Sequence, residues 1–375
     1  MSSVEKILSR ILVYSFPRRI VFGLNSIDNI ADEVKVLNGR NILLVADPVV
    51  AKTDAFAKIK GKLEAAEISF SLYDKVEPEP RLALAEEAAE LARRMKVDSV
   101  LAVGGGSTMD VGKAAALSVT NPGAVENYIG MNLVKSRSAP LICAPTTSGS
   151  GSEVTPYAVI TIGKKKTDIV SRNIVPDSVL LDPTLTVSMP PKLTANSGLD
   201  SLSHAVEAVL STDASPLTDS LAFQAINLIA RNIRTAYREG SNMKARSAMH
   251  LAATMSGIAF TNARLVVGHS ISQTFAPIYD IPHGQSCAMA LPYAMEFYLS
   301  TIPERLALVA IAMDESAVEL EAEKAAKEAV RIVRRLVEDL NIPLSLKEVG
   351  VPEEKLSTLA ELCIKEWPRP NSPRP

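Results

Sequence analysis

Four side chains in the second half of the chain have the chemistry to hold a divalent metal. They are Asp200, His204, His269 and His283, and they include three of the four histidines in the chain. Asp200 and His204 are four residues apart, so on a helix they share one face. One carboxylate and three imidazoles suit Zn²⁺ or Fe²⁺ and leave one side open for a substrate oxygen. The sequence therefore predicts a catalytic metal site here.

Some of these residues also have a structural interpretation. Asp200 and His204 lie in an apolar segment, where a carboxylate and an imidazole could simply satisfy each other. The fourth histidine, His250, has no second ligand near it in the sequence, and we interpret it as structural. We expect no cysteine thiolate near the four ligands, which favours a catalytic site over a closed structural one.

A glycine-rich turn in the first half could bind a phosphate. Gly104, Gly105, Gly106 and Ser107 follow an apolar segment that reads as a strand, and a helical pattern begins after them. Glycines let a ligand approach the backbone, and the first N–H groups of a helix favour an anion such as pyrophosphate. The alternative is an ordinary strand–helix turn, because the spacing is not that of the common dinucleotide fingerprint.

Polar residues at two other strand ends fit the same cofactor. Asp47 ends the strand predicted over 41–46, where a carboxylate can bind ribose hydroxyls and repel a 2′-phosphate, which favours NAD over NADP. Thr146 and Thr147 follow the strand predicted over 141–144 and could contact phosphate, ribose or nicotinamide. Taken alone, each group could also be a polar turn or a helix cap.

The hydrophobic patterns predict the elements that must position these residues. Short apolar segments alternate with helical patterns in the first half, which indicates a parallel sheet. Strands are predicted at 16–23, 41–46, 68–73, 99–103, 141–144, 158–162 and 178–181. From Leu193 onward the period is helical, and helices are predicted at 193–211, 216–237, 243–261, 263–276, 285–300, 303–313, 315–340 and 353–365. The prediction is a Rossmann-like α/β dinucleotide-binding domain, 1–190, and an all-α metal-binding domain, 191–375.

Composition excludes several classes of function. The net charge is −2 and the pI is about 6.2, so the chain has no bulk attraction for nucleic acid or an anionic membrane. No apolar segment approaches the roughly 20 residues that span a bilayer, and the first residues do not read as a secretory signal. Three cysteines far apart in sequence indicate no disulfide framework. We expect a cytoplasmic protein.

Longer motifs around these residues resemble the iron-containing (group III, metal-dependent) alcohol dehydrogenases, within the dehydroquinate synthase-like fold. The resemblance covers nearly the whole chain and rests on GGGSTMD (104–110), PTTSGSGSEVT (145–155), LDPTLTVSMPPKLTANSGLDSLSHAVEA (181–208) and the segment 262–284. It implies hydride transfer between NAD and a small alcohol or aldehyde, with the metal as Lewis acid on the substrate oxygen. It also implies a homodimer or larger assembly.

The resemblance assigns roles to individual residues. The metal ligands it implies are Asp200, His204, His269 and His283, with Fe²⁺ expected and Zn²⁺ also acceptable. The cofactor-binding residues it implies are Asp47, Gly104, Gly105, Gly106, Ser107, Thr146, Thr147, Thr155 and Lys166.

Three features depart from the family pattern. Gln273 stands where the family usually has a second active-site histidine, and glutamine cannot move a proton by titrating. Glu79 stands where an asparagine usually precedes proline, which adds a negative charge near the cofactor. The chain ends at Pro375, where the family usually continues into another helix.

Three rival functions remain on the same fold. A polyol dehydrogenase acting on glycerol, a 1,2- or 1,3-diol or lactaldehyde is one alternative. A non-redox cyclase of the dehydroquinate synthase type would need several basic residues near the metal, and Arg264 is the nearest obvious one in the sequence. The third is a catalytically idle scaffold, for which Gln273 would be the sign of decay.

Overall fold

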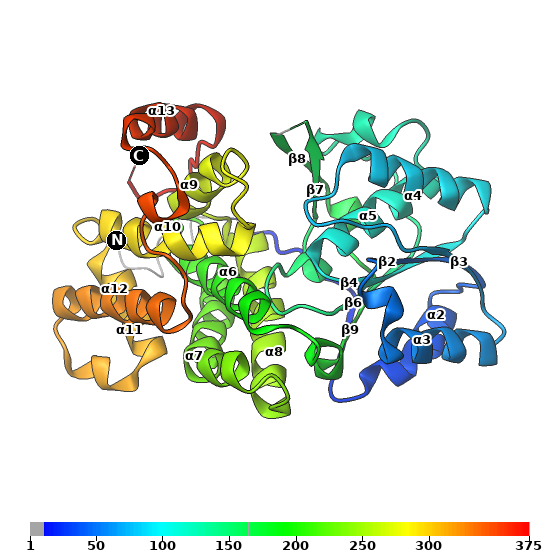
Figure 1. The fold of residues 1–375 in the computed structure, drawn as a ribbon, viewed down its shortest axis with the longest axis horizontal. Coiled ribbons are helices and arrows are strands. Elements are labelled where there is room, and N and C mark those ends of the chain that lie inside the picture. Colours follow the sequence, from blue (N-terminus) through cyan, green and yellow to red (C-terminus); the bar gives the residue numbers. More distant parts are fainter. Residues whose placement is uncertain (1–10, 164, 375) are drawn as a thin grey trace.

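The computed structural model describes residues 11–163 and 165–374. Six parallel strands form its main sheet (Figure 1). In spatial order they are β1 (Arg19–Phe22), β9 (Ser178–Leu181), β6 (Leu141–Pro145), β4 (Ser99–Gly104), β2 (Asn41–Ala46) and β3 (Ser69–Tyr73). A smaller sheet has the order β5 (Gly130–Met131), β8 (Lys165–Val170) and β7 (Tyr157–Ile162), and its β7–β8 pair is antiparallel.

Helices cover both faces of the main sheet. They are α2 (Ile30–Val36), α3 (Asp54–Ala65), α4 (Leu82–Arg94) and α5 (Gly106–Thr120). In β2, Ile42 and Leu44 belong to an apolar cluster with residues of α2 and α3. Leu43 and Val45 belong to a second cluster with residues of α4 and α5. Successive side chains of a strand point to opposite faces, so a continuous apolar strand serves both layers.

The chain becomes helical after the last strand (Figure 1). The helices are α6 (Pro191–Leu210), α7 (Pro216–Arg238), α8 (Met243–Ala263), α9 (Val267–Phe275), α10 (His283–Tyr298), α11 (Pro303–Met313), α12 (Ala322–Asp339) and α13 (Leu356–Glu366). The first of these helices begins at Pro191, and the division into two domains at residue 190 stays a prediction. No helix in the described ranges is both long and apolar enough to cross a membrane.

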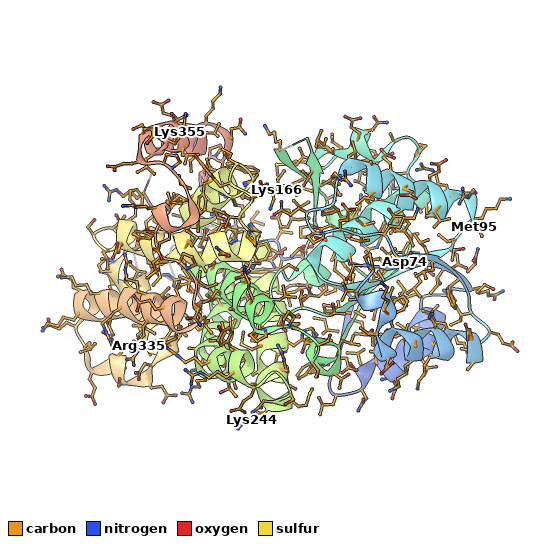
Figure 2. All side chains as sticks on the ribbon, in the orientation of Figure 1. Asp74, Met95, Lys166, Lys244, Arg335 and Lys355 are labelled. Atoms are coloured by element: carbon orange, nitrogen blue, oxygen red, sulfur yellow. The ribbon has the colours of Figure 1, made fainter. Side chains whose placement is uncertain are left out.

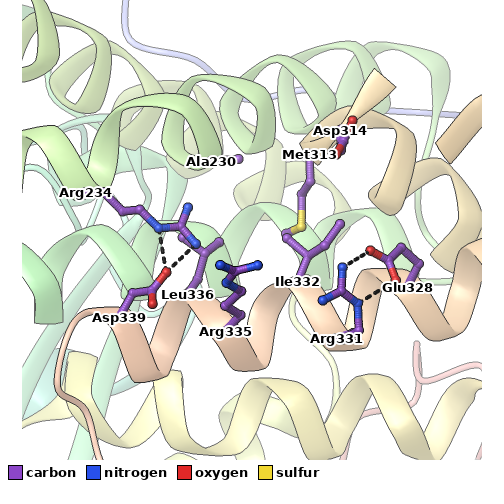
Figure 3. Close-up of a pocket in the computed structure, with 10 residues that line it drawn as sticks. All are labelled: Ala230, Arg234, Met313, Asp314, Glu328, Arg331, Ile332, Arg335, Leu336 and Asp339. Carbon is purple, nitrogen blue, oxygen red and sulfur yellow. Dashed lines mark hydrogen bonds and ion pairs between the residues drawn. The ribbon is translucent and has the colours of Figure 1, made fainter. Parts of the chain in front are cut away.

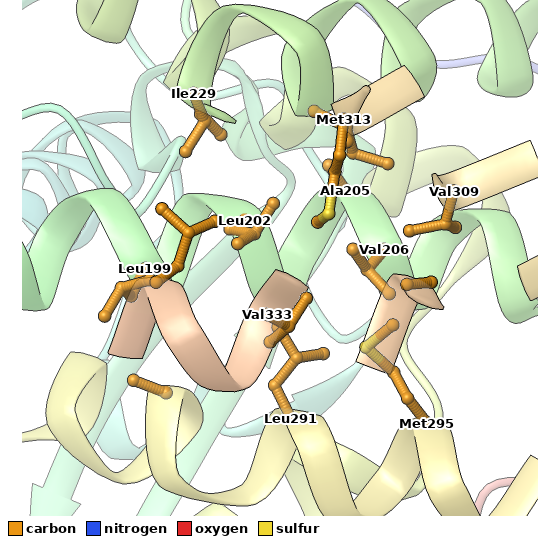
Figure 4. Packing of buried hydrophobic residues seen from close by; sticks show 14 of the residues in the cluster. Leu199, Leu202, Ala205, Val206, Ile229, Leu291, Met295, Val309, Met313 and Val333 are labelled. Atoms are coloured by element: carbon orange, nitrogen blue, oxygen red, sulfur yellow. The ribbon is translucent and has the colours of Figure 1, made fainter. Parts of the chain in front are cut away.

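Helix α6 lies at the centre of the helical half. Leu202 and Val206 of α6 are fully buried and pack in one cluster with residues of α7, α10, α11 and α12 (Figure 4). The apolar residues of α6 fix this helix from several sides. Its polar residues are therefore held in position by the surrounding helices.

The predicted fold class is confirmed, and the differences concern element boundaries and two strands of the smaller sheet. The predicted strand 16–23 shortens to β1, and β5 and β8 were not predicted. The helix predicted to start at 263 starts at Val267, because α8 ends at Ala263 and Arg264 follows with a φ of 64°. The helix predicted over 315–340 divides into a 3-10 turn, Glu315–Glu319, and α12.

Candidate metal centre and cofactor edge

One face of α6 carries three buried polar side chains. Asp200, His204 and Glu207 follow one another at spacings of four and three residues, which places them on the same face of the helix. Their exposed fractions are 5%, 4% and 1%. Buried groups of this kind need partners, and these partners come from α9 and α10.

The predicted ligands converge on one carboxylate oxygen. Asp200 Oδ1 lies 3.7 Å from His204 Nε2, 3.9 Å from His269 Nε2 and 3.8 Å from His283 Nε2. This oxygen is buried and accepts no hydrogen bond within the described part of the chain. Ligands about 2.1 Å from a tetrahedral ion lie about 3.4 Å from one another. These distances suit a divalent metal, which would satisfy the unpaired oxygen. Of the four predicted ligands, Asp200, His269 and His283 belong to a group of donor atoms that all lie within 4.8 Å of one another, and His204 lies outside this group.

Glu207 holds His269 in the orientation that a ligand needs. Glu207 Oε1 lies 2.6 Å from His269 Nδ1, and Glu207 Oε2 accepts hydrogen bonds from the backbone N–H groups of Val266 and His269. A carboxylate accepts, so Nδ1 donates, and Nε2 is the ring nitrogen left to bind a metal. A Cβ on Gly268 would lie 2.6 Å from Glu207 Oε1, which explains the glycine before His269.

His204 is held by stacking. Its ring lies between those of Phe260 and His269, with centroid separations of 4.3 and 4.7 Å. Burial lowers the pKa of His204 to about 4 and that of His283 to about 3. Both imidazoles are therefore neutral near pH 7, which is the form that binds a metal.

The structure corrects the expectation that no cysteine is near the ligands. Four donor atoms, one each from Asp200, His269, His283 and Cys287, all lie within 4.8 Å of one another. Cys287 is four residues after His283 on α10, so both side chains lie on one face of that helix. The spacing of these two residues was the sequence signal for this thiol. Glu207 was also missed, although it extends the Asp200–His204 face by one helical turn.

The carboxyl edge of the parallel sheet brings the predicted cofactor loops together. Thr146 N donates to Gly104 O at 2.9 Å, so the loops after β4 and β6 run side by side. A Cβ on Gly105 would lie 3.4 Å from Thr147 Cγ2. Helix α5 begins at Gly106, so its first N–H groups face this edge. The arrangement suits a pyrophosphate at the start of α5.

Asp47 serves as a cap and still lies at the expected edge. Its Oδ1 accepts hydrogen bonds from the N–H groups of Val49 at 2.8 Å and Val50 at 2.9 Å. Its side chain is partly exposed at the end of β2. The capping interpretation and the ribose interpretation are compatible, because each uses a different part of the carboxylate.

Lys166 lies in β8, in the hairpin that β7 and β8 form, and is largely buried. It is 8% exposed, and its Nζ lies 2.8 Å from Glu79 Oε1. Glu79 N donates to Ser107 Oγ at 3.2 Å, so Glu79 links the hairpin to the glycine loop. Figure 2 labels Lys166 on the side of the hairpin that faces the helical half. The negative charge that Glu79 adds is therefore balanced by Lys166.

Thr155 lies deeper than the other predicted cofactor residues. It is 2% exposed, and its hydroxyl accepts a hydrogen bond from Lys113 Nζ at 3.2 Å. Lys113 also donates to Ser152 Oγ, which in turn donates to Asp110 Oδ1 at 2.7 Å. This buried network fixes the loop that follows β6 against α5.

Gln273 contacts the C-terminal segment. Its Oε1 accepts a hydrogen bond from the Arg369 guanidinium at 2.7 Å, and Arg369 Nε donates to Ser270 Oγ at 3.1 Å. Arg369 was not singled out in the sequence, because it is about a hundred residues from its partners. It places a cation beside α9.

Two other features are not part of the metal centre. His250 is 3.1 Å from Ser148 Oγ through Nδ1 and is absent from the cluster of four donor atoms. A surface pocket lies between α7, α11 and α12 (Figure 3), and none of the predicted ligands lines it. Its Arg331 pairs with Glu328 and its Arg234 with Asp339, so ion pairs already satisfy these charges.

Comparison with known families identifies the class. A model described as iron-containing alcohol dehydrogenase matches residues 17–183, and one described as the C-terminal part of the Fe-containing alcohol dehydrogenase family matches residues 194–375. The chain therefore belongs to the iron-containing alcohol dehydrogenases. The predicted family and enzyme class, a metal-dependent oxidoreductase, are confirmed.

Individual relatives are similar to this chain over almost their whole length. The chain is 37% identical to 1,3-propanediol dehydrogenase of Citrobacter freundii over 97% of this chain and 95% of the relative. A crystal structure of 1,3-propanediol oxidoreductase superimposes with a TM-score of 0.94 at 36% identity, covering 98% and 96% of the two chains. Sulfoacetaldehyde reductase of Bifidobacterium kashiwanohense, solved with NAD⁺, gives 0.86 at 29% identity, covering 97% and 94%.

Proposed function

We propose that the protein interconverts a small alcohol and its aldehyde with NAD, at a divalent metal held by Asp200, His204, His269 and His283. The observation that carries the proposal is the convergence of three imidazole nitrogens within 3.7 to 3.9 Å of the unpaired Asp200 Oδ1. Fe²⁺ is the metal expected from the family, and Zn²⁺ suits the same donors.

When bound, the metal supplies positive charge that stabilises negative charge on the substrate oxygen. The side chains around it have separate tasks. Glu207 fixes the tautomer and direction of His269 through the bond at Nδ1. The ring of Phe260 covers one face of His204 and limits the approach of water from that side.

The cofactor site is proposed at the carboxyl edge of the sheet. The nicotinamide is the group that gives or accepts the hydride. The residues proposed to bind NAD are Asp47, Gly104, Gly105, Gly106, Ser107, Thr146, Thr147, Thr155 and Lys166. The start of α5 would bind the pyrophosphate, and Asp47 would accept hydrogen bonds from the adenosine ribose. Lys166 would reach a ribose only after exchanging its contact with Glu79.

The proton of the alcohol must leave without a second histidine on α9. Gln273 has no titrating proton, and its amide oxygen is already bonded to Arg369. We therefore propose that water or a ribose hydroxyl conducts the proton. Gln273 positions Arg369 instead of exchanging protons.

A diol is the second candidate substrate. The relative from Citrobacter freundii is a 1,3-propanediol dehydrogenase at 37% identity, and it supports a substrate with two hydroxyl groups. The non-redox cyclase and the idle scaffold have no comparable support. The carboxylate and the three imidazoles proposed to bind the metal are present, with His204 Nε2 3.7 Å from Asp200 Oδ1, and the family is one of oxidoreductases.

The test follows NADH absorbance with metal-loaded protein and three aldehydes: propanal, 3-hydroxypropanal and sulfoacetaldehyde. We expect stoichiometric NADH oxidation with propanal or 3-hydroxypropanal. Asp200→Asn should abolish it, while Asp32→Asn, which changes an exposed carboxylate on α2, should not. A faster rate with 3-hydroxypropanal would select the diol candidate. No oxidation with any of the three would contradict the proposed function.

We also propose a homodimer or larger assembly in the cytoplasm. Strand β1 lies at one edge of the main sheet and pairs there with β9. Ile20, Phe22 and Leu24 are 38%, 44% and 55% exposed at this edge, which suits contact with a second copy. The three cysteines are free, as expected in a reducing compartment. Light scattering of the Phe22→Lys variant and of the unmodified protein would test whether this edge forms the interface. The substitution should lower the molar mass of the assembly in solution.

A further inference from the structure

The thiol of Cys287 lies among the metal-binding side chains and not in the apolar core. It is 2% exposed on α10. Its neighbours Ala288 and Leu291 belong to the large apolar cluster of the helical half, whereas Cys287 belongs to none of the apolar clusters in the described ranges. Cys143 shows the contrast, because it packs in the apolar layer between the sheet and α5.

The contacts of Cys287 are those of a donor group. Its Sγ lies 3.5 Å from His269 Nε2 and 3.6 Å from His283 Nε2. These are the same nitrogens that point toward Asp200 Oδ1. Ser272 Oγ also lies 3.2 Å from Sγ, within hydrogen-bond distance. A buried free cysteine often acts as a small hydrophobe, but here its neighbours are nitrogens and oxygens.

We propose that Cys287 Sγ is a fifth donor of the metal centre, in addition to the carboxylate and the three imidazoles. This inference rests on the proposed function, because it assumes a metal at this site. As the bond between sulfur and metal forms, the thiol loses its proton to solvent, and no other reagent is consumed.

A thiolate changes which metals the centre prefers. Oxygen and nitrogen donors alone accept Fe²⁺, Mn²⁺ and Zn²⁺, whereas a soft sulfur donor shifts the preference toward Zn²⁺ and Co²⁺. The chain should therefore retain Zn²⁺ or Co²⁺ more strongly than a centre with the same carboxylate and imidazoles and no thiol.

The test uses cobalt as a spectroscopic probe. Full-length protein loaded with one Co²⁺ should show near-ultraviolet absorption from sulfur-to-cobalt charge transfer. Cys287→Ser should lose this absorption, and Cys363→Ser, the matched control on α13, should keep it. One bound Co²⁺ without the absorption, or absorption that persists in Cys287→Ser, would overturn the proposal.

A second measurement does not depend on spectroscopy or turnover. Transfer of Zn²⁺ to a chromogenic chelator should be about tenfold faster from Cys287→Ser and Cys287→Ala than from the unmodified protein. Cys363→Ser should match the unmodified protein. Equal transfer rates in all four proteins would contradict a role for Cys287. If the unmodified protein binds no metal at all, the proposed function fails. If it binds metal and turns over while the Cys287 variants behave identically, only this inference fails.

Discussion

The cofactor edge and the metal centre are built in different ways. At the cofactor edge, short loops after β4 and β6 present backbone and small side chains, and Gly105, Gly106 and Ser107 are partly exposed. At the metal centre, side chains from three helices converge, and Asp200 and His269 are 5% and 1% exposed. A backbone site tolerates the loss of one side chain better than a site made of buried side chains. The two regions should therefore respond very differently to single substitutions.

The largest effect is expected from His269→Ala. This change removes one imidazole and leaves Glu207 Oε1 buried without its partner. Turnover should fall about a thousandfold or more, as expected when several kcal/mol of charge stabilisation are lost. Metal content by elemental analysis should fall with it. His250→Asn, a histidine change outside the cluster, is the control. Full metal occupancy and full turnover in His269→Ala would contradict the expectation that the metal centre is more sensitive to single substitutions than the cofactor edge.

Glu207→Gln sharpens the account of the metal centre. Glutamine keeps the size of the side chain but loses the charge that fixes the His269 tautomer. Metal affinity should fall about 10- to 100-fold, and the measurement is competition with a chelator of known affinity. Glu207→Asp, which keeps the charge but is shorter, should recover part of the loss. An unchanged affinity in Glu207→Gln would mean that the bond to His269 is only structural.

Asp47→Asn tests the cofactor edge. Asparagine keeps an oxygen for the cap over Val49 and Val50 but removes the charge that repels a 2′-phosphate. The preference for NADH over NADPH, measured as a ratio of kcat/KM values, should fall about tenfold. Asp54→Asn, an exposed acid at the start of α3, is the control. An unchanged ratio of kcat/KM values would mean that Asp47 only caps the turn and does not select between NADH and NADPH.

The smallest effect concerns His250 and pH. Burial lowers its pKa to about 3. Below its ordinary pKa near 6.5 the unfolded chain binds a proton that the folded chain does not, so stability falls as pH falls. His250→Asn should reduce the loss of unfolding free energy between pH 6 and pH 5 by at most about 1.4 kcal/mol. Urea unfolding of metal-free protein at both values measures this. If both proteins lost the same unfolding free energy between pH 6 and pH 5, the lowered pKa of His250 would be contradicted.

The sequence predicted the cofactor edge and the metal centre to different degrees. Gly104 to Ser107 and Asp47 could be placed from local patterns, because the carboxyl ends of parallel strands always meet at one edge. The convergence of His269 and His283 on α6 depended on how three helices pack, which local periodicity does not encode. The resemblance to the family supplied it.

Three contacts needed the folded structure. They are the contacts of Lys166 with Glu79, of Gln273 with Arg369, and of Cys287 with the imidazoles. The first two pairs are far apart in the sequence, so no local pattern predicts them. Cys287 is close to His283 in the sequence, but a single cysteine in an apolar helix does not by itself indicate a metal ligand. Composition and periodicity constrain burial and element type. They do not determine which polar groups meet after packing.

The most direct test of the central claim is turnover with and without metal. The protein is treated exhaustively with a chelator, its metal content is measured, and NADH oxidation by propanal or 3-hydroxypropanal is followed before and after one equivalent of Fe²⁺ or Zn²⁺ is returned. We predict that activity disappears with the metal and returns in proportion to the ion restored, up to one per chain. Undiminished turnover in protein shown to be metal-free would contradict the account.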